Sequence, residues 1–201
     1  MWSFQARLAL LAIVLLTING CSSPTPGPSE PPGDPLAASL PSELDCEDAW
    51  EGNPTYDPAA PGAEGVSSLA WQGSPPSYSW PIDNETKGQA YKALDGSIRG
   101  AWKAPITVDA GLGKRTIEVV SPSNAELVVA AASEWESNQA LREGRIQLPH
   151  SYTINSCPEN VTQFPGMLLV QGPACVVIKV TDPATGRSST VSVPMYGGKC
   201  P

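Results

Sequence analysis

The chain has 201 residues, of which 12 are Lys or Arg and 20 are Asp or Glu, so its formal net charge is −8 at pH 7. This acidic balance argues against nucleic acid and against anionic lipid surfaces as partners, because both are bound through patches of Lys and Arg. It excludes partners better than it names them, since an acidic balance is also common among soluble exported proteins.

The first 20 residues have the pattern of an export signal. Arg7 supplies positive charge, and Leu8–Ile18 is an apolar run of eleven residues without a charge. A bilayer span needs about 20 apolar residues, so this run is too short to cross a membrane, but it matches the core of a signal peptide. We therefore expect residues 1–20 to be a signal that plays no part in the fold.

Cys21 follows directly after the small residue Gly20, and Ile18 supplies an apolar position before it. This arrangement resembles a bacterial lipobox, which implies a diacylglyceryl group on the sulfur of Cys21. Two or more acyl chains give stable anchoring, where one chain would be marginal. We expect a lipoprotein held at the outer face of the bacterial cell membrane. The alternative is an ordinary cleaved signal with a chance cysteine.

Residues 21–42 predict a tether between the anchor and the folded part. Residues 22–42 hold seven prolines and almost no large apolar side chains, so they cannot bury enough surface to offset the entropy of ordering. Where extended, this stretch reaches roughly 60 Å from the membrane. Residues 43–201 then form one domain.

The domain contains four cysteines, which we expect to form two disulfides: Cys46, Cys157, Cys175 and Cys200. An even number in an exported chain favours this reading, and no pair has the C-x₂-C spacing of a zinc site. If the strands near the last three cysteines are successive antiparallel neighbours, Cys157 can pair with Cys175 or with Cys200. We favour Cys157–Cys200 with Cys46–Cys175.

The fold class that we predict is mainly β, a small immunoglobulin-like antiparallel β-sandwich. Residues 43–80 are rich in Gly and Pro and predict coil with one short helical turn at 43–50. Short β-branched or alternating runs bounded by turn residues then recur every eight to twelve residues. We expect strands at 101–108, 115–120, 145–148, 152–154, 167–170, 175–180 and 189–193.

Residues 123–144 are contested. Ser123 and Glu126 form a capping-box pattern and Gly144 suits a helix C-cap, which favours a helix. Leu127–Val129 and the flanking strands favour a strand. We predict a strand at 125–132 followed by a polar turn region.

Four aromatic side chains are candidates for a sugar-stacking platform: Trp71, Tyr78, Trp80 and Trp102. The alternative is that they fill the ends of the sandwich, since large aromatic side chains bury much area each. The acidic cluster of Asp45, Glu47, Asp48 and Glu51 lacks the order of an EF-hand loop. We interpret it as a solvated face, and we expect no metal site.

The last third of the chain carries a pattern of its own. It consists of Cys157-Pro158, then Thr162-Gln163-Phe164-Pro165-Gly166 leading to Val170-Gln171-Gly172-Pro173-Ala174-Cys175, and a closing Gly197-Gly198-Lys199-Cys200. These residues resemble a family of uncharacterised exported lipoproteins and membrane-tethered domains of high-GC Gram-positive bacteria. The resemblance covers about 45 residues. It implies an all-β exported domain and brings no activity with it.

The sequence contains no recognisable catalytic set. His150 is the only histidine, and no G-x-S-x-G motif accompanies it, so a Ser-His-Asp triad is not indicated. Phosphate-binding loops are also absent, and we expect no cofactor. Five glutamates could still supply the paired carboxylates that glycoside hydrolysis requires: Glu118, Glu126, Glu134, Glu136 and Glu143.

The function that we predict is therefore non-enzymatic. The chain is expected to be a lipid-anchored binding or interaction module of the cell envelope, with the membrane as a partner through Cys21 and an envelope protein or wall glycan as its ligand. The alternative is a small envelope glycan hydrolase that uses paired carboxylates.

Overall fold

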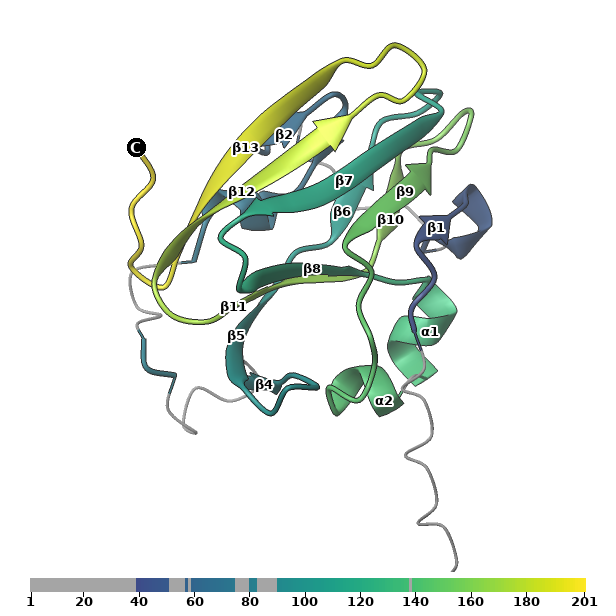
Figure 1. The fold of residues 1–201 in the computed structure, drawn as a ribbon. Coiled ribbons are helices and arrows are strands. Elements are labelled where there is room, and N and C mark those ends of the chain that lie inside the picture. Colours follow the sequence, from purple (N-terminus) through teal and green to yellow (C-terminus); the bar gives the residue numbers. More distant parts are fainter. Residues whose placement is uncertain (1–38, 51–56, 58, 75–79, 83–89, 138) are drawn as a thin grey trace, which may run out of the picture. The chain divides into compact units, whose positions relative to one another are not determined.

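The computed structural model describes residues 39–50, 57, 59–74, 80–82, 90–137 and 139–201. Its largest sheet has five strands, drawn at the top of Figure 1. In spatial order they are β1 (Glu43–Leu44), β9 (Ser151–Asn155), β7 (Lys114–Ser121), β12 (Ala174–Thr181) and β13 (Ser188–Met195). Every pair is antiparallel except β1 with β9.

Two four-stranded sheets complete the β structure. The first has the order β10 (Thr162–Phe164), β6 (Ile106–Val108), β3 (Val66–Ser67) and β2 (Gly62–Ala63). The second has the order β4 (Ala90–Lys92), β5 (Ile98–Lys103), β11 (Gly166–Val170) and β8 (Ala125–Val129). The prediction of a mainly β, antiparallel β-sandwich is confirmed.

These two sheets are halves of one bent ribbon. The predicted strand 101–108 is interrupted at Ala104–Pro105, and Pro165 interrupts the partner strand between β10 and β11. A proline has no N–H for the ladder, so pairing breaks where it stands. The Ala104 N–H still donates to the Gly166 carbonyl at 2.9 Å, which keeps the two halves in register across the bend.

The main core lies between the five-stranded sheet and the bent ribbon. Alternate residues of β12 and β7 point into it, as period-two patterning requires. Examples with no exposed surface are Ile178, Ile117, Ile106, Phe164 and Leu168. Burying one such aliphatic side chain stabilises the fold by about 1.5–3 kcal/mol.

A second, smaller core lies on the other face of β8 and β11. Val128 and Leu169 pack there with Tyr91, Leu141 and Ile146. Two short helices border this core, α1 (Ala132–Ser137) and α2 (Gln139–Arg142). In Figure 1 both lie at the lower right, below β8 and on the far side of it from the five-stranded sheet.

The contested segment thus contains both predicted structures. The strand prediction is confirmed at Ala125–Val129, but the polar turn predicted after it is wrong, because α1 and α2 follow. Gly144 caps α2 with a φ of +67°, and the Arg145 N–H donates back to the Ala140 carbonyl at 2.8 Å. Local helix signals dominate after Val129 because the chain has left the sheet there.

Other boundaries differ from prediction. Residues 145–148 form no strand; Gln147 makes only an isolated parallel bridge with Ser39. Leu40 is buried against the second core, so the end of the predicted tether belongs to the fold. The described part of region 43–80 holds β1, β2, β3 and two 3₁₀ helices, η1 (Cys46–Asp48) and η2 (Leu69–Gln72). Only η1 matches the short helical turn expected there.

The disulfides are Cys46–Cys157 and Cys175–Cys200. The prediction of two disulfides is confirmed, but the pairing that we favoured is wrong. Strand β7 lies between β9 and β12, so those two strands run in the same direction. Cys157 follows the end of β9, and Cys175 stands at the start of β12, at the opposite end of the sheet. Because β13 is antiparallel to β12, Cys200 after it lies beside Cys175 and away from Cys157, whereas β1 is parallel to β9 and places Cys46 beside Cys157.

Candidate functional site

The predicted aromatic platform is not assembled as expected. Trp71 is 1% exposed and belongs to the main core, so the prediction is wrong for this residue, which has no free face for a sugar. Trp80 and Trp102 are partly buried against the same core, and Tyr78 lies outside the described residues. These indole rings pack against the core because each buries a large apolar area there.

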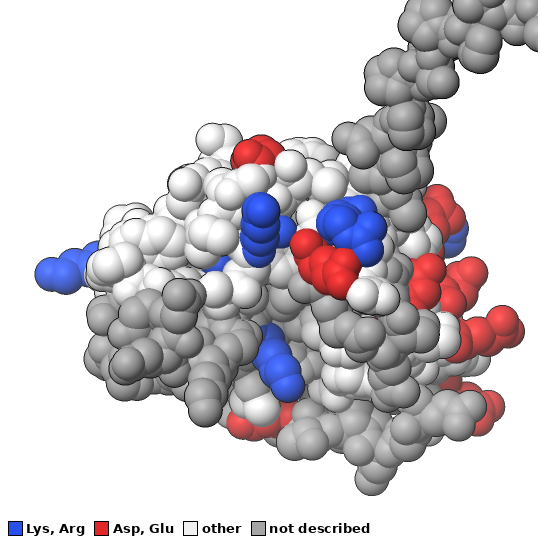
Figure 2. Space-filling model, turned by 90° about the horizontal axis from the view of Figure 1, so that it is seen from below, with Lys and Arg blue, Asp and Glu red and all other residues white. Residues whose placement is uncertain are grey.

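The acidic cluster is partly used for local structure. The Asp45 N–H donates to the Asp48 carboxylate at 2.8 Å, and Asn155 donates to the Asp45 carboxylate at 3.3 Å. Figure 2 shows acidic side chains gathered along one flank, on the side where Figure 1 places β1 and η1. Glu51 lies outside the described residues. Within the described ranges, no group of three His, Cys, Asp or Glu is arranged to hold a metal ion.

The candidate glutamates stand on separate elements. Glu118 on β7 pairs with Lys179 of β12 at 2.9 Å, and Glu143 after α2 accepts from Arg145 at 2.7 Å. Glu134 on α1 has a buried carboxylate oxygen without a hydrogen-bond partner. The side chain of Glu136 lies outside the described part of the chain. Among the described side chains of the five, Glu126 is the one that lines the candidate groove.

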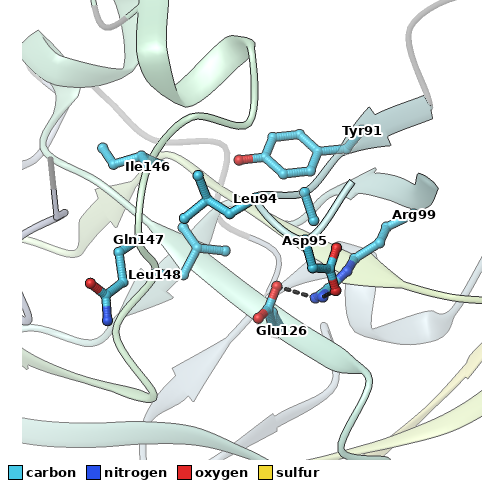
Figure 3. Close-up of a pocket in the computed structure, with 9 residues that line it drawn as sticks. Tyr91, Leu94, Asp95, Arg99, Glu126, Ile146, Gln147 and Leu148 are labelled. Carbon is cyan, nitrogen blue, oxygen red and sulfur yellow. Dashed lines mark hydrogen bonds and ion pairs between the residues drawn. The ribbon is translucent and has the colours of Figure 1, made fainter. Parts of the chain in front are cut away.

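The groove consists of two adjoining pockets of about 310 and 290 Å³, which share Glu126 and Leu148. The first pocket lies over β4 and β5, and Figure 3 shows its lining. The second lies along β8, where Leu148, Pro149 and His150 form the facing wall. We call this continuous hollow the β8 groove.

An ion-pair cluster forms the polar centre of the β8 groove. Arg99 on β5 pairs with Glu126, and its other terminal nitrogen lies 3.4 Å from the Asp95 carboxylate. In Figure 3 the guanidinium group stands between the two carboxylates. The Arg99 side chain is 11% exposed, whereas those of Glu126 and Asp95 are 38% and 61% exposed. The cluster therefore presents one net negative charge to the groove.

The local fold explains this placement. The Asp95-Gly96-Ser97 turn joins β4 to β5, with the Ala93 N–H donating to the Ser97 carbonyl at 2.9 Å. Hydrogen bonds from the Ser97 side chain and backbone lower the pKa of Asp95 below its ordinary value, and Arg99 lowers it further. Asp95 is thus an ionised carboxylate, unsuited to donate a proton.

Tyr91 contributes the remaining polar group. Its side chain is 6% exposed, and its hydroxyl is buried without a hydrogen-bond partner in the structure. Burial first, and the negative charge of Glu126 second, raise the pKa of Tyr91. A protonated hydroxyl at the pocket wall can donate a hydrogen bond to a ligand, provided that the ligand displaces the side chains that cover the hydroxyl.

Apolar side chains flank the polar centre. Leu94 at one end is 52% exposed and Val120 at the other is 48% exposed. Exposed aliphatic side chains that rim a groove are typical of ligand or partner surfaces. His150 lines the second pocket, and in the described residues it has no hydrogen bond to a serine or a carboxylate.

Sequence reasoning missed Tyr91, Leu94, Asp95 and Arg99. The Asp-Gly-Ser turn between short alternating runs was a usable hairpin signal, and it would have placed Asp95 and Arg99 at neighbouring strand ends. No sequence signal pairs Arg99 with Glu126, because the strand between them, β11, comes 40 residues after Glu126.

Among the described residues, no helix is both long and apolar enough to cross a bilayer. Comparisons of the chain with family models, with curated proteins and with solved structures find no match.

Proposed function

We propose that this protein is an exported module that is anchored by lipid at Cys21 to the outer face of the cell membrane. It binds an envelope component in the β8 groove and does not catalyse a reaction on it. The observation that carries the proposal is the groove itself. It combines a polar centre of one net negative charge with exposed apolar flanks on a scaffold closed by two disulfides.

The cysteines support the anchor. All four cysteines of the folded part pair with one another, so neither of these two disulfides uses Cys21. Structural disulfides form in oxidising compartments, which agrees with export past the membrane. Cys21 itself lies outside the described residues.

Electrostatics favour binding over hydrolysis. Glycoside hydrolysis needs one carboxyl that holds a proton and a second that is ionised. In the β8 groove both carboxylates contact the same guanidinium group, and the pKa of Asp95 is lowered. The hydrogen bonds from Ser97, and then the charge of Arg99, stabilise the anion of Asp95, which is the wrong state for an acid catalyst.

The anchor is tested by intact mass and detergent partitioning of the native protein beside Cys21→Ser. We expect a mass increase of lipid size and partitioning into detergent, both lost in the variant. An unmodified chain in the aqueous phase would refute the anchor.

The binding role is tested by retention of the full chain on isolated cell envelopes. We expect the double variant Asp95→Asn, Glu126→Gln to reduce retention at least tenfold. The matched control is Glu118→Gln, which removes a charge from another strand-to-strand ion pair, Glu118–Lys179, and should leave retention unchanged. Equal retention of all three proteins would sink the proposal. Release of sugar fragments by the native protein, lost in the double variant, would establish the hydrolase instead.

A further inference from the structure

We infer that the ligand of the β8 groove is an extended peptide that pairs with the edge of β8 at Leu127 and sets a Lys or Arg side chain against Glu126. This inference rests on the proposed binding function and names its ligand class. It starts from the backbone of β8, which among the described strands has a neighbour on one side only, β11.

The hydrogen-bond phase of β8 can be derived from its surroundings. The Ala130 N–H donates to the Pro165 carbonyl at 3.2 Å, in line with the pairing of Val128 with Met167 and of Glu126 with Leu169. In an antiparallel ladder every second residue directs its N–H and C=O to the partner. The backbone groups of Leu127 therefore point away from β11.

The opposite strand pairing gives the same phase. The Gly166 carbonyl accepts from the Ala104 N–H of the β5–β6 segment at 2.9 Å. The backbone groups of β11 thus point to β5 at residues 166, 168 and 170, and to β8 at residues 167 and 169. Leu127 lies opposite Leu168, so its own N–H and C=O are left outside this ladder.

These outward groups of Leu127 face the second pocket of the groove, which Ala125, Glu126 and Leu127 line. In the described part of the chain, nothing forms a hydrogen bond with them. The residue is 4% exposed. An unpaired backbone pair with so little access to bulk water is costly, and a peptide backbone in the adjacent pocket would satisfy both groups at once.

Charge and apolar contacts then select the peptide. A side chain of the added strand beside Glu126 would lie about 5 Å from it between Cβ atoms. Because the Asp95–Arg99–Glu126 cluster keeps one net negative charge, a Lys or Arg at this position is favoured. Neighbouring side chains would meet Val120 and Leu148. The expected ligand alternates apolar and polar residues around one basic residue.

The test begins with selection from a displayed library of random peptides on the full chain. We expect enriched sequences with a central Lys or Arg between apolar residues. The best synthetic peptide is then made in two versions. One carries N-methyl groups on the backbone amides of its odd-numbered residues, and the other carries them on those of its even-numbered residues. Because only one set faces β8, one version should lose at least tenfold in affinity and the other should retain it. No enrichment, or equal effects of the two versions, would overturn the inference.

A second readout uses the protein without substitution. Hydrogen exchange of the Leu127 amide should slow at least tenfold when the peptide binds, and that of the exposed Thr190 amide should not change. Glu126→Gln should weaken the peptide at least fivefold, and Glu118→Gln should not. A wall-glycan fragment that binds in the groove where no peptide does would refute the peptide while leaving the binding function in place. If the native protein and the Asp95→Asn, Glu126→Gln variant are retained equally on isolated envelopes, the peptide inference and the proposed binding function are both refuted.

Discussion

Arg99 on β5 reaches across β11 to form an ion pair with Glu126 on β8, and it thereby ties together three strands that are distant in the sequence. The pair lies at the centre of the β8 groove. Its basic member is nearly buried and its acidic member is partly exposed, so it contributes to stability as well as to the charge of the site.

This pair predicts a measurable coupling. Arg99→Ala should lower the free energy of unfolding by about 1–3 kcal/mol, because Glu126 and Asp95 then repel each other without their shared cation. Urea unfolding of Arg99→Ala, Glu126→Ala and the double variant measures the interaction. Additive effects of the two substitutions would contradict the coupling.

The disulfides should differ in their contributions. Cys46–Cys157 closes a separation of 111 residues and Cys175–Cys200 one of 25. If loop entropy dominates, replacing both members of the first pair by Ser should destabilise the fold by about 1 kcal/mol more than replacing both members of the second. Denaturant unfolding of the two double variants checks the difference, and peptide mapping without reduction checks the pairing. An equal or reversed ranking would show that strain or residual structure dominates.

Acid should weaken the fold through Asp182. Burial by itself would raise the pKa of this carboxyl, but hydrogen bonds from Thr185 and Ala184 and the charge of Arg115 outweigh it and hold the pKa below its ordinary value. The native state therefore binds this proton less readily than the unfolded chain does. Its stabilising contribution is present above the unfolded pKa of about 3.9 and is lost as pH falls through the lower native value.

The variant Asp182→Asn should accordingly lose part of the decrease in stability between pH 5 and pH 2. Urea unfolding across this range measures the loss. The control is Asp109→Asn, whose carboxylate forms no ion pair within the described residues. An unchanged pH profile in Asp182→Asn would contradict the assignment.

Gly144 should tolerate substitution far less than Gly113. Both have a positive φ, +67° and +69°, so alanine at either position has the same conformational cost of the left-handed region. A Cβ at Gly144 would lie 1.5 Å from the Lys92 carbonyl oxygen, whereas a Cβ at Gly113 meets nothing within 4 Å. Gly113→Ala should lower the free energy of unfolding by about 1 kcal/mol and Gly144→Ala by at least about 2 kcal/mol more. Thermal or urea unfolding compares the two variants. Similar decreases in the free energy of unfolding would mean that the backbone angle alone causes the destabilisation and that the contact with Lys92 does not contribute.

Local pattern was enough for much of the fold. The β-branched run 175–180 and the alternation in 189–193 predict strands that the structure contains, because one face of each is buried and period two then governs the side chains. The turn at Asp182–Gly186 and the helix cap at Gly144 follow from local backbone chemistry. Long-range pairing did not follow. A parallel strand of two residues, β1, leaves almost no pattern, and yet it brings Cys46 to Cys157.

The β8 groove shows the same division. Glu126 stood among five candidate glutamates, and nothing local distinguished it from Glu118. Its partner Arg99 and the wall at Leu148 come from segments whose distance in space depends on sheet order. Trp71, a candidate for the aromatic platform, is buried for a related reason, since sequence shows that an indole is large but not which side of a sheet it occupies.

The sequence by itself determined the fold class, because short alternating strands and an even number of cysteines in the folded part are local properties of the chain. Only the tertiary structure decided which cysteines pair, which tryptophan is buried and which carboxylate lines a groove. Those outcomes depend on the order of strands in the sheets, and that order is set by the burial of the whole core at once, which no short stretch encodes.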